Sequence, residues 1–166
     1  MRLLLCLVCA GLAAQTLPKI PAENLAGEKV ELPTIAAGKA AILVVGFTHA
    51  SQSQTKAWSA RLAQEFPEQS GVAVYSLAVL EDVPKLVRGM AVHGIKSGVP
   101  NAQRQRFLLV YHNEAELKRA AAFDRPDDAY LLLLDPAGAV RWSFHGAVSD
   151  SAIAEVQKQV HALDQK

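Results

Sequence analysis

Hydrophobic residues along the chain fall into short, nearly unbroken runs that alternate with segments in which apolar residues recur every three or four positions. Unbroken runs of this length are typical of strands covered on both faces of a sheet. The three- to four-residue repeat predicts amphipathic helices. Strands are expected at 28–33, 41–47, 72–80 and 106–112, and helices at 53–66, 83–95, 113–123 and 150–163.

Each predicted helix carries its apolar residues on one side, and two of them carry a cap. Asn113 is a good N-cap residue, and Glu116 three positions on completes the pattern of a capping box. Ser149, Asp150 and Ser151 offer a cap to the last helix. The apolar stripes are Trp58, Leu62 and Phe66 in the first helix, Leu86, Val87, Met90 and Ala91 in the second, and Ile153, Val156, Val160 and Leu163 in the last.

The sequence AYLLLLDPAGAVRWSF, residues 129–144, predicts a β-hairpin. Its turn, DPAG, has proline at the second position and glycine at the fourth, as a type I turn prefers. Strands therefore alternate with helices until a final hairpin and helix. This order predicts an α/β fold with a central mixed sheet of about five strands, helices on both faces and a C-terminal β-hairpin plus helix.

The first residues, MRLLLCLVCAGLAAQTLP, have the features of a secretory signal. One arginine precedes an apolar run that is too short to span a bilayer, and small residues follow. We expect cleavage after Ala14. A lipoprotein cut before Cys9 is less favoured, because Val8 stands where a small residue is needed. The expected organisation is a signal peptide at 1–14, a proline-containing lead-in at 15–27 and one domain at 28–166, in a periplasmic or secreted protein without a membrane span.

Charge and cysteine content exclude two classes of function. The formal net charge of the 166 residues is +1 and no block is strongly basic, so a nucleic-acid partner has no electrostatic basis. The two cysteines, Cys6 and Cys9, both lie in the expected signal. A chain cleaved after Ala14 would have no thiolate, which is the nucleophile of disulfide exchange and peroxide reduction.

Several motifs resemble known families. The order of elements, with NLAGEKVELP before GKAAILVVGF, resembles the peroxiredoxin and thiol-disulfide reductase branches of the thioredoxin-like superfamily. PNAQRQRFLLVYHNEAELKRAAAF followed by YLLLLDPAGAVRWSFHGAVSDSAIAEV is similar to the mitochondrial ATP synthase assembly factor ten family. The pieces that carry this similarity are Y-L-x-L-x-D, G-x-V-R-W from Gly138 to Trp142, Gly146, and the tryptophan of TKAW.

The resemblance implies a thioredoxin-like domain without an obligatory cysteine pair that helps to assemble a membrane subunit of the synthase. Where redox thioredoxins have their cysteine loop, this chain has ASQSQT, residues 50–55. The position of their cis-proline falls at Ala129. Pro126 lies three residues earlier, and only a shifted alignment would bring it there. The resemblance thus implies a degenerate binding face that comprises His49, Ser51, Gln52, Ser53, Gln54, Thr55, Arg125, Asp128 and Ala129.

Two chemical alternatives use these residues differently. Ser51 or Ser53 could be a nucleophile with His49 as its base, but no G-x-S-x-G elbow is present, and helix capping by the serines is the simpler interpretation. Imidazoles could converge on zinc or Cu(II), but no H-x-x-x-H spacing supports such a site, so we predict no cofactor. The histidines concerned are His49, His112 and His145.

The second strand of the hairpin offers another surface. Alternation places Trp142 on the side of the core, while the opposite side forms a polar edge. Such an edge is either an ordinary amphipathic edge strand or a place where a partner adds a strand. The polar residues are Arg141, Ser143 and His145.

The sequence therefore predicts an exported thioredoxin-like domain without redox cysteines. It would bind a protein or polypeptide, as an assembly factor or chaperone. Two alternatives stay open, a divergent enzyme of the thiol-reductase and peroxiredoxin group, and a module that binds a small ligand or metal.

Overall fold

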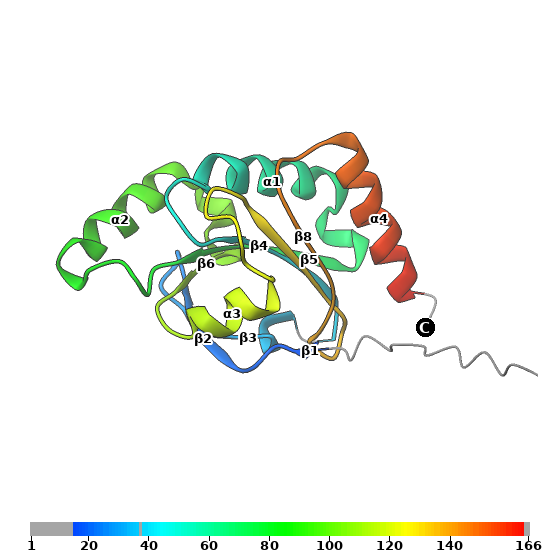
Figure 1. Ribbon diagram of the computed structural model, residues 1–166, viewed down its shortest axis with the longest axis horizontal. Coiled ribbons are helices and arrows are strands. Elements are labelled where there is room, and N and C mark those ends of the chain that lie inside the picture. The colour runs from blue at the N-terminus through cyan, green and yellow to red at the C-terminus, as the bar shows by residue number, and fades with distance from the viewer. Residues whose placement is uncertain (1–14, 37, 165–166) are drawn as a thin grey trace, which may run out of the picture.

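The computed structural model describes residues 15–36 and 38–164, which form one eight-stranded mixed sheet with helices on both faces (Figure 1). The strand order is β1-β8-β7-β4-β5-β6-β2-β3. The strands are β1 Gln15–Thr16, β2 Ile20–Asn24, β3 Lys29–Leu32, β4 Ala40–Gly46, β5 Val72–Val79, β6 Phe107–Val110, β7 Tyr130–Leu134 and β8 Ala139–His145, the α-helices are α1 Gln52–Glu65, α2 Lys85–Gly98, α3 Glu114–Ala120 and α4 Asp150–Asp164, and short 3-10 turns lie at η1 Thr34–Ala36, η2 Glu68–Ser70 and η3 Asn101–Arg106.

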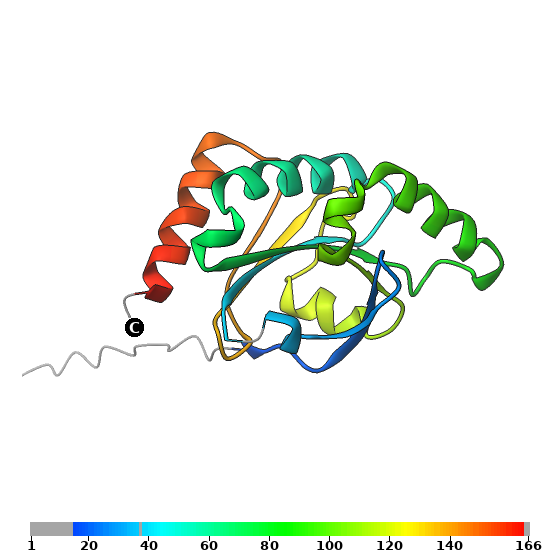
Figure 2. The same ribbon diagram turned by 180° about the vertical axis from the view of Figure 1, so that it is seen from behind.

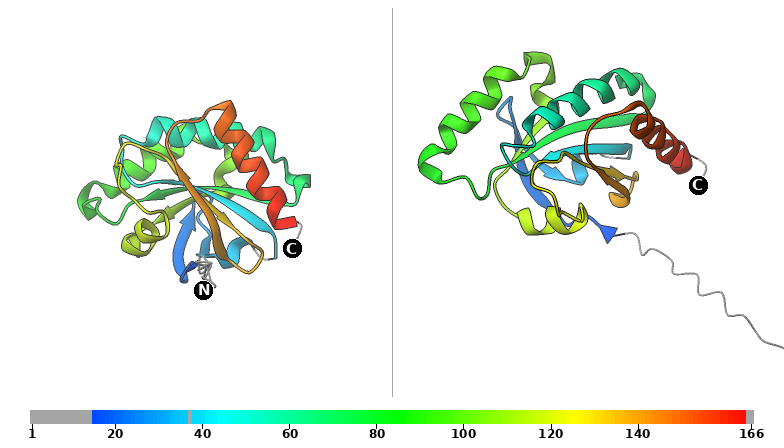
Figure 3. Two further views of the ribbon diagram at one scale, coloured as in Figure 1. Left: turned by 45° about the vertical axis from the view of Figure 1, so that its right-hand side comes forward. Right: turned by 45° about the horizontal axis from the view of Figure 1, so that its top comes forward.

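The centre of the sheet is β4, which pairs with β5 in parallel and with β7 in antiparallel orientation. Its residues alternate between two cores, as the pleat of a strand requires. Ile42 and Val44 face α1 and α4, whereas Leu43 and Val45 face α3. The unbroken apolar run is therefore explained by burial on both faces, and Figure 3 shows the helices above and below the sheet.

The sheet has eight strands, so the expectation of about five was too low. Six of the eight lie where strands were expected, and residues 15–27, the expected lead-in, contribute the other two, β1 and β2. β2 forms a hairpin with β3 and also pairs with β6, but only from Ala22 to Asn24. Pro21 thus lies beyond the end of the β6 ladder. Proline is tolerated at such an end but makes the strand hard to recognise in a sequence.

The cap of α3 differs from the predicted capping box. Asn113 has a left-handed backbone (φ 66°) and its side chain makes no capping hydrogen bond. The Glu81 carboxylate, from the loop after β5, instead accepts a hydrogen bond of 2.7 Å from the Glu114 N–H. A carboxylate is favoured at a helix N-terminus, so a remote residue supplies the cap expected of a local one.

The predicted hairpin turn is confirmed. The Asp135 carboxylate accepts hydrogen bonds of 2.9 Å from the N–H groups of Ala137 and Ala139 and lies 2.6 Å from the Arg141 guanidinium. Burial of Asp135 would raise the pKa of its carboxyl, but these hydrogen bonds and the arginine outweigh burial and lower it. The same residue thus closes the turn and ties it to β8.

The helix α2 departs from expectation, because the apolar side noted in the sequence points outward. Leu86 is 96% exposed and Met90 is 74% exposed. The opposite side of the helix packs on the body through Val92 and Ile95, in a small cluster that also contains Leu109. The helix has apolar residues on both sides, so periodicity alone does not identify the buried one. None of the described helices is long and apolar enough to cross a membrane.

The turn glycine gives a test of the packing beneath the hairpin. Gly138 has φ +82°, and a Cβ there would lie 2.5 Å from Cγ of Pro33. We expect Gly138→Ala to lower the free energy of unfolding by about 2–4 kcal/mol, from backbone strain and overpacking together. Gly71 has φ +79° with open space around it, so Gly71→Ala should cost only about 1 kcal/mol. Chemical denaturation measures both, and equal losses would refute the Pro33 contact.

Candidate functional site

The candidate site lies at the edge of the sheet where the parallel strands β4, β5 and β6 have their carboxyl ends. β4 has a parallel neighbour on one side and an antiparallel one on the other. Ligands of open α/β sheets bind at such an edge, outside the carboxyl ends of the strands. The loop after β4 and the loop before β7 meet here (Figure 1).

Side chains from α1 and the loop after β4 hold these two loops together. The Thr48 hydroxyl donates to the Pro126 carbonyl at 2.5 Å. The Gln54 amide bridges further, since its Nε2 donates to Asp128 at 3.4 Å and its Oε1 accepts from the Ala129 N–H at 3.3 Å. The ASQSQT segment and the loop at residues 124–128 are therefore neighbours, as the resemblance to thioredoxin-like proteins implied.

His145 joins this group from the end of β8. Its Nδ1 lies 2.8 Å from Oδ2 of Asp128, and its Nε2 lies 3.7 Å from Asp124. The carboxylate can only accept, so Nδ1 carries the proton of that bond. The hydrogen bond from His145, helped by the one from Gln54, holds the pKa of Asp128 below its usual range. The sequence had placed His145 on a separate edge, apart from Asp128.

Tyr130 holds the loop at residues 124–128 in place. No role was predicted for this residue from the sequence. It is fully buried at the start of β7, and its ring stacks on the His145 imidazole with 5.3 Å between centroids. Its hydroxyl oxygen accepts from the N–H groups of Asp124 and Arg125 at 3.0 and 2.8 Å. The only signal for this role was its place at the head of the Y-L-x-L-x-D motif.

Two other motif residues support the site from behind. The Gly146 N–H donates to the Ala129 carbonyl at 3.1 Å. The indole N–H of Trp58, a fully buried residue of α1, donates to the Gly146 carbonyl at 2.8 Å. Trp58 and Gly146 thus fix the backbone of Ala129, which explains why both occur in the motif.

Ser51 and Thr55 have structural roles, and side-chain capping by Ser51 is not found. Ser51 occupies the N-cap position in a helical conformation, and its buried hydroxyl donates to the Thr48 carbonyl at 2.9 Å. The Thr55 hydroxyl donates to the Ser51 carbonyl. Both side chains pack closely on Gly46, so a serine in this turn satisfies its hydroxyl locally instead of facing solvent.

The remaining predicted residues lie on the surface. His49, Gln52 and Ser53 are exposed around the start of α1, and His49 makes no hydrogen bond with either serine in the described part of the chain. Arg125 is exposed in the loop. On β8 the alternation is as predicted. Arg141 and Ser143 are exposed, Trp142 is partly buried, and Arg141 pairs with Asp135.

The histidines lie apart from one another in the described part of the chain. Within residues 15–36 and 38–164, no group of three or more His, Cys, Asp or Glu side chains could hold a metal ion. His112 lines a separate surface cavity with Tyr111, whereas His145 pairs with Asp128. The cis-proline of redox thioredoxins also has no counterpart at Ala129 or Pro126, because the peptide bonds before both residues are trans. Leu32–Pro33 is the only cis peptide bond in residues 15–36 and 38–164.

Comparison with models of known protein families shows to which family the chain is related. The sequence model of the ATP10 protein family matches residues 12–163, nearly the whole chain. The chain belongs to the ATP10 protein family. A search of curated proteins finds none that matches.

Solved structures similar to this ATP10 family member share its thioredoxin-like fold at low sequence identity. The thioredoxin domain of a thiol-disulfide oxidoreductase from Bacteroides vulgatus has a TM-score of 0.59 at 18% identity, over 89% of this chain and 96% of that one. An exposed lipoprotein thioredoxin from Streptococcus pneumoniae has a TM-score of 0.62 at 10% sequence identity, over 86% of this chain and 99% of that one. BsSco, a member of the Sco family of cytochrome c oxidase assembly proteins, has a TM-score of 0.57 at 15% sequence identity, over 90% of this chain and 95% of that one.

The lowered pKa of Asp128 predicts how stability depends on pH. A carboxyl whose pKa is lower in the folded state stabilises the fold above its unfolded value, here 3.8, and loses that effect as the pH falls through the folded value. We expect Asp128→Asn to reduce the free energy of unfolding by about 1 kcal/mol near neutral pH. The difference should shrink once the pH falls below 3.8.

Urea denaturation between pH 7 and pH 3 measures this effect. The neighbouring Asp127 is exposed, so Asp127→Asn serves as the control and should change little at any pH. A loss that is the same in both variants, or that persists unchanged at low pH, would contradict the Asp128–His145 hydrogen bond as the cause.

Proposed function

We propose that this ATP10 family member is an exported assembly factor that binds an extended polypeptide at the face formed by Gln54, Asp128, Ala129 and His145. Family membership supports an assembly role. The similar fold of BsSco, itself described as one of a family of oxidase assembly proteins, agrees with such a role on this scaffold. The bound polypeptide would be a segment of the protein under assembly.

The Gln54 amide is the observation that carries the proposal. It offers one acceptor to the Ala129 N–H and one donor to the Asp128 carboxylate. An extended peptide presents the same pair of groups from its backbone. At 3.3 and 3.4 Å both bonds are long and weak. A bound peptide can therefore replace the amide at little cost, since hydrogen bonds are exchanged and not lost.

The positions of the cysteines support binding without thiol chemistry. The sequence contains two, Cys6 and Cys9, both within the expected signal. The hydroxyl of Ser51, in the segment where a reactive thiol would stand, is buried and engaged with a main-chain carbonyl. A buried, satisfied hydroxyl is a poor nucleophile, because a base must reach its proton. These features favour binding over an enzyme of the peroxiredoxin and thiol-reductase group.

Site-specific photo-crosslinking tests the binding face. A benzophenone amino acid replaces Gln52, which is exposed beside the site, or Gln64, which is exposed near the other end of α1. In the host cell, position 52 should capture a discrete protein and position 64 should not. Adding Gln54→Ala removes the competing amide and should raise capture at position 52 about fivefold, the equivalent of roughly one hydrogen bond. Equal capture at 52 and 64, or none at 52, would overturn the proposed face.

Export and processing have a separate test. We expect the protein isolated from its host to begin at Gln15 and to show no free thiol with a thiol reagent after denaturation. Intact mass and N-terminal sequencing measure both. Retention of Cys6 and Cys9 in the isolated protein would contradict cleavage after Ala14 and return thiol chemistry to consideration.

A further inference from the structure

The outward face of α2 exposes large apolar side chains that its packing does not require. Leu86 is 96%, Met90 74% and Val87 41% exposed, and the other large hydrophobic residues of the described part of the chain are less exposed. Leu86 and Met90 are four residues apart, so they share one side of the helix. Val92 and Ile95 already attach the opposite side to the body. Contiguous exposed apolar side chains of this kind mark an interaction site.

The surrounding segment is basic and contains no acidic residue. Residues 83–113 carry five lysines and arginines and no Asp or Glu, whereas the rest of the chain carries 12 basic and 16 acidic residues. Lys85 and Lys96 are eleven residues apart, or three helical turns, and so line the same flank of the Leu86–Met90 stripe. A partner for this face should be apolar and negatively charged. The five basic residues are Lys85, Arg88, Lys96, Arg104 and Arg106. Arg106 pairs with Glu68, and Arg88 and Arg104 donate to main-chain carbonyls, so the argument for an anionic partner rests on Lys85 and Lys96.

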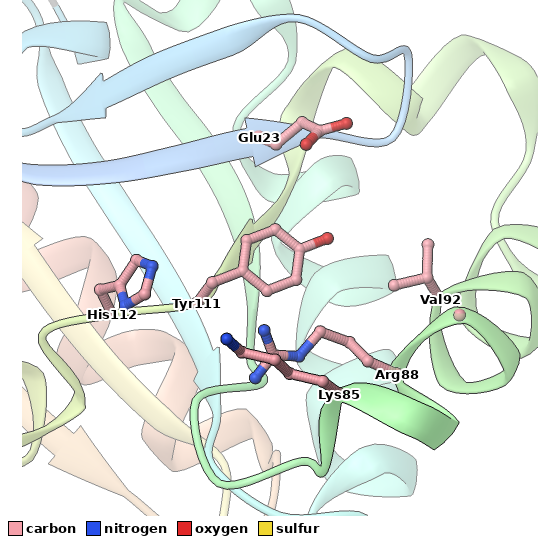
Figure 4. Close-up of a pocket in the computed structure, with 7 residues that line it drawn as sticks. Glu23, Lys85, Arg88, Val92, Tyr111 and His112 are labelled. Carbon is pink, nitrogen blue, oxygen red and sulfur yellow. The ribbon is translucent and has the colours of Figure 1, made fainter.

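Next to the stripe, an open cavity of about 530 Å³ separates the first turns of α2 from the end of β6 (Figure 4). Lys85, Arg88 and His112 line it, and Glu23 of β2 stands on the opposite wall. The Arg88 guanidinium lies 5.3 Å from the centre of the Tyr111 ring and donates to two main-chain carbonyls. Lys85 lines the cavity from the first turn of α2, beside Leu86, and is the cation best placed for an anion on the stripe.

The position of α2 suits a broad, flat partner. The helix forms one end of the molecule, next to β6 and away from α4 (Figures 1 and 2). Leu86 and Met90 are mostly exposed on this helix, so an extended surface is a suitable partner for them. Apolar side chains on a helix flanked by lysines are the pattern that binds in the plane of an anionic bilayer.

We propose that the outward face of α2 binds the surface of an anionic phospholipid membrane. Leu86 and Met90 enter the boundary between headgroups and acyl chains, and Lys85 and Lys96 contact lipid phosphates. The binding is peripheral and reversible, because two apolar side chains and two lysines make a small contact. This surface is separate from the face at Gln54 and Asp128 and does not depend on the function proposed for it.

A local fluorescent reporter tests the proposal in the full chain. The apolar run at residues 3–10 could itself attach the chain to vesicles, so total binding is not informative. Met90→Trp places the reporter on the stripe, and Ala154→Trp, at an exposed position of α4, is the matched control. Emission of the parent chain, with Trp58 and Trp142, is subtracted. With vesicles of phosphatidylcholine and phosphatidylglycerol, the remaining emission of the Met90→Trp variant should move to shorter wavelength and be quenched by brominated acyl chains, whereas the control should not respond.

The lysines give the quantitative part of the test. Lys85→Ala and Lys96→Ala, each added to Met90→Trp, should weaken partition to these vesicles about fivefold, the usual contribution of one basic residue near an anionic surface. Raising the salt concentration should weaken it further, and vesicles of phosphatidylcholine alone should bind weakly.

Four outcomes would overturn the proposal. An equal response of the Ala154→Trp control places the attachment elsewhere. An equal response to phosphatidylcholine alone removes the role of charge. Short-wavelength emission from Met90→Trp before vesicles are added means that protein already covers the stripe, and its loss on dilution would identify a second copy. No response to vesicles, together with capture of a protein by a crosslinker at position 90, would make an acidic protein surface the occupant.

Discussion

Burial of β4 on both faces is the constraint on which the rest of the structure depends. An unbroken apolar strand can exist in water only if both of its faces are covered, so α1 and α4 must lie on one side and α3 on the other. Its two partners run in opposite directions, β5 parallel and β7 antiparallel. The loop after β4 and the loop before the antiparallel β7 consequently meet at the carboxyl end of β4. The polar residues of the site gather there because the apolar interior excludes them.

The site is built from side chains that satisfy one another. Gln54 bonds Asp128 and Ala129, Asp128 bonds His145, and Tyr130 beneath them holds the loop. A segment whose main chain is tied at several points presents a defined face at little further entropic cost. The resemblance to redox thioredoxins implies a cysteine loop at residues 50–55, and in this chain that segment contains Gln54 and no cysteine. A hydrogen-bonding amide there suits the proposed recognition of a main chain.

The two proposed surfaces differ in their chemistry and therefore in what they can bind. The face around Gln54 is polar and offers hydrogen-bond donors and acceptors, which select an extended chain by its backbone. The outward face of α2 is apolar and basic, which suits an extended anionic surface but gives little selectivity between proteins. An assembly factor that held a polypeptide at one face and a bilayer at the other would keep its client close to the membrane.

The sequence alone determined the elements whose cause is local. The hairpin turn follows from DPAG, the central strand from six successive apolar residues, and the buried side of α1 from Trp58 and its repeat. The similarity to the family was also recognisable, because its short motifs are local features of the sequence. Strands β1 and β2 escaped detection, because β1 has only two residues and Pro21 weakens the local pattern of β2. Pairing with β8, and with β3 and β6, makes them strands.

Only the tertiary structure decided the contacts between distant residues. Glu81 caps α3 across 33 positions, Gln54 reaches Ala129 across 75, and His145 meets Asp128 from another strand. The same holds for α2, where both sides are apolar and packing against Leu109 of β6 determines which of them is buried. Local periodicity shows which side of a segment prefers the core and which prefers water. The hydrogen-bond partner of a polar group depends instead on how the whole chain brings the donor and the acceptor together.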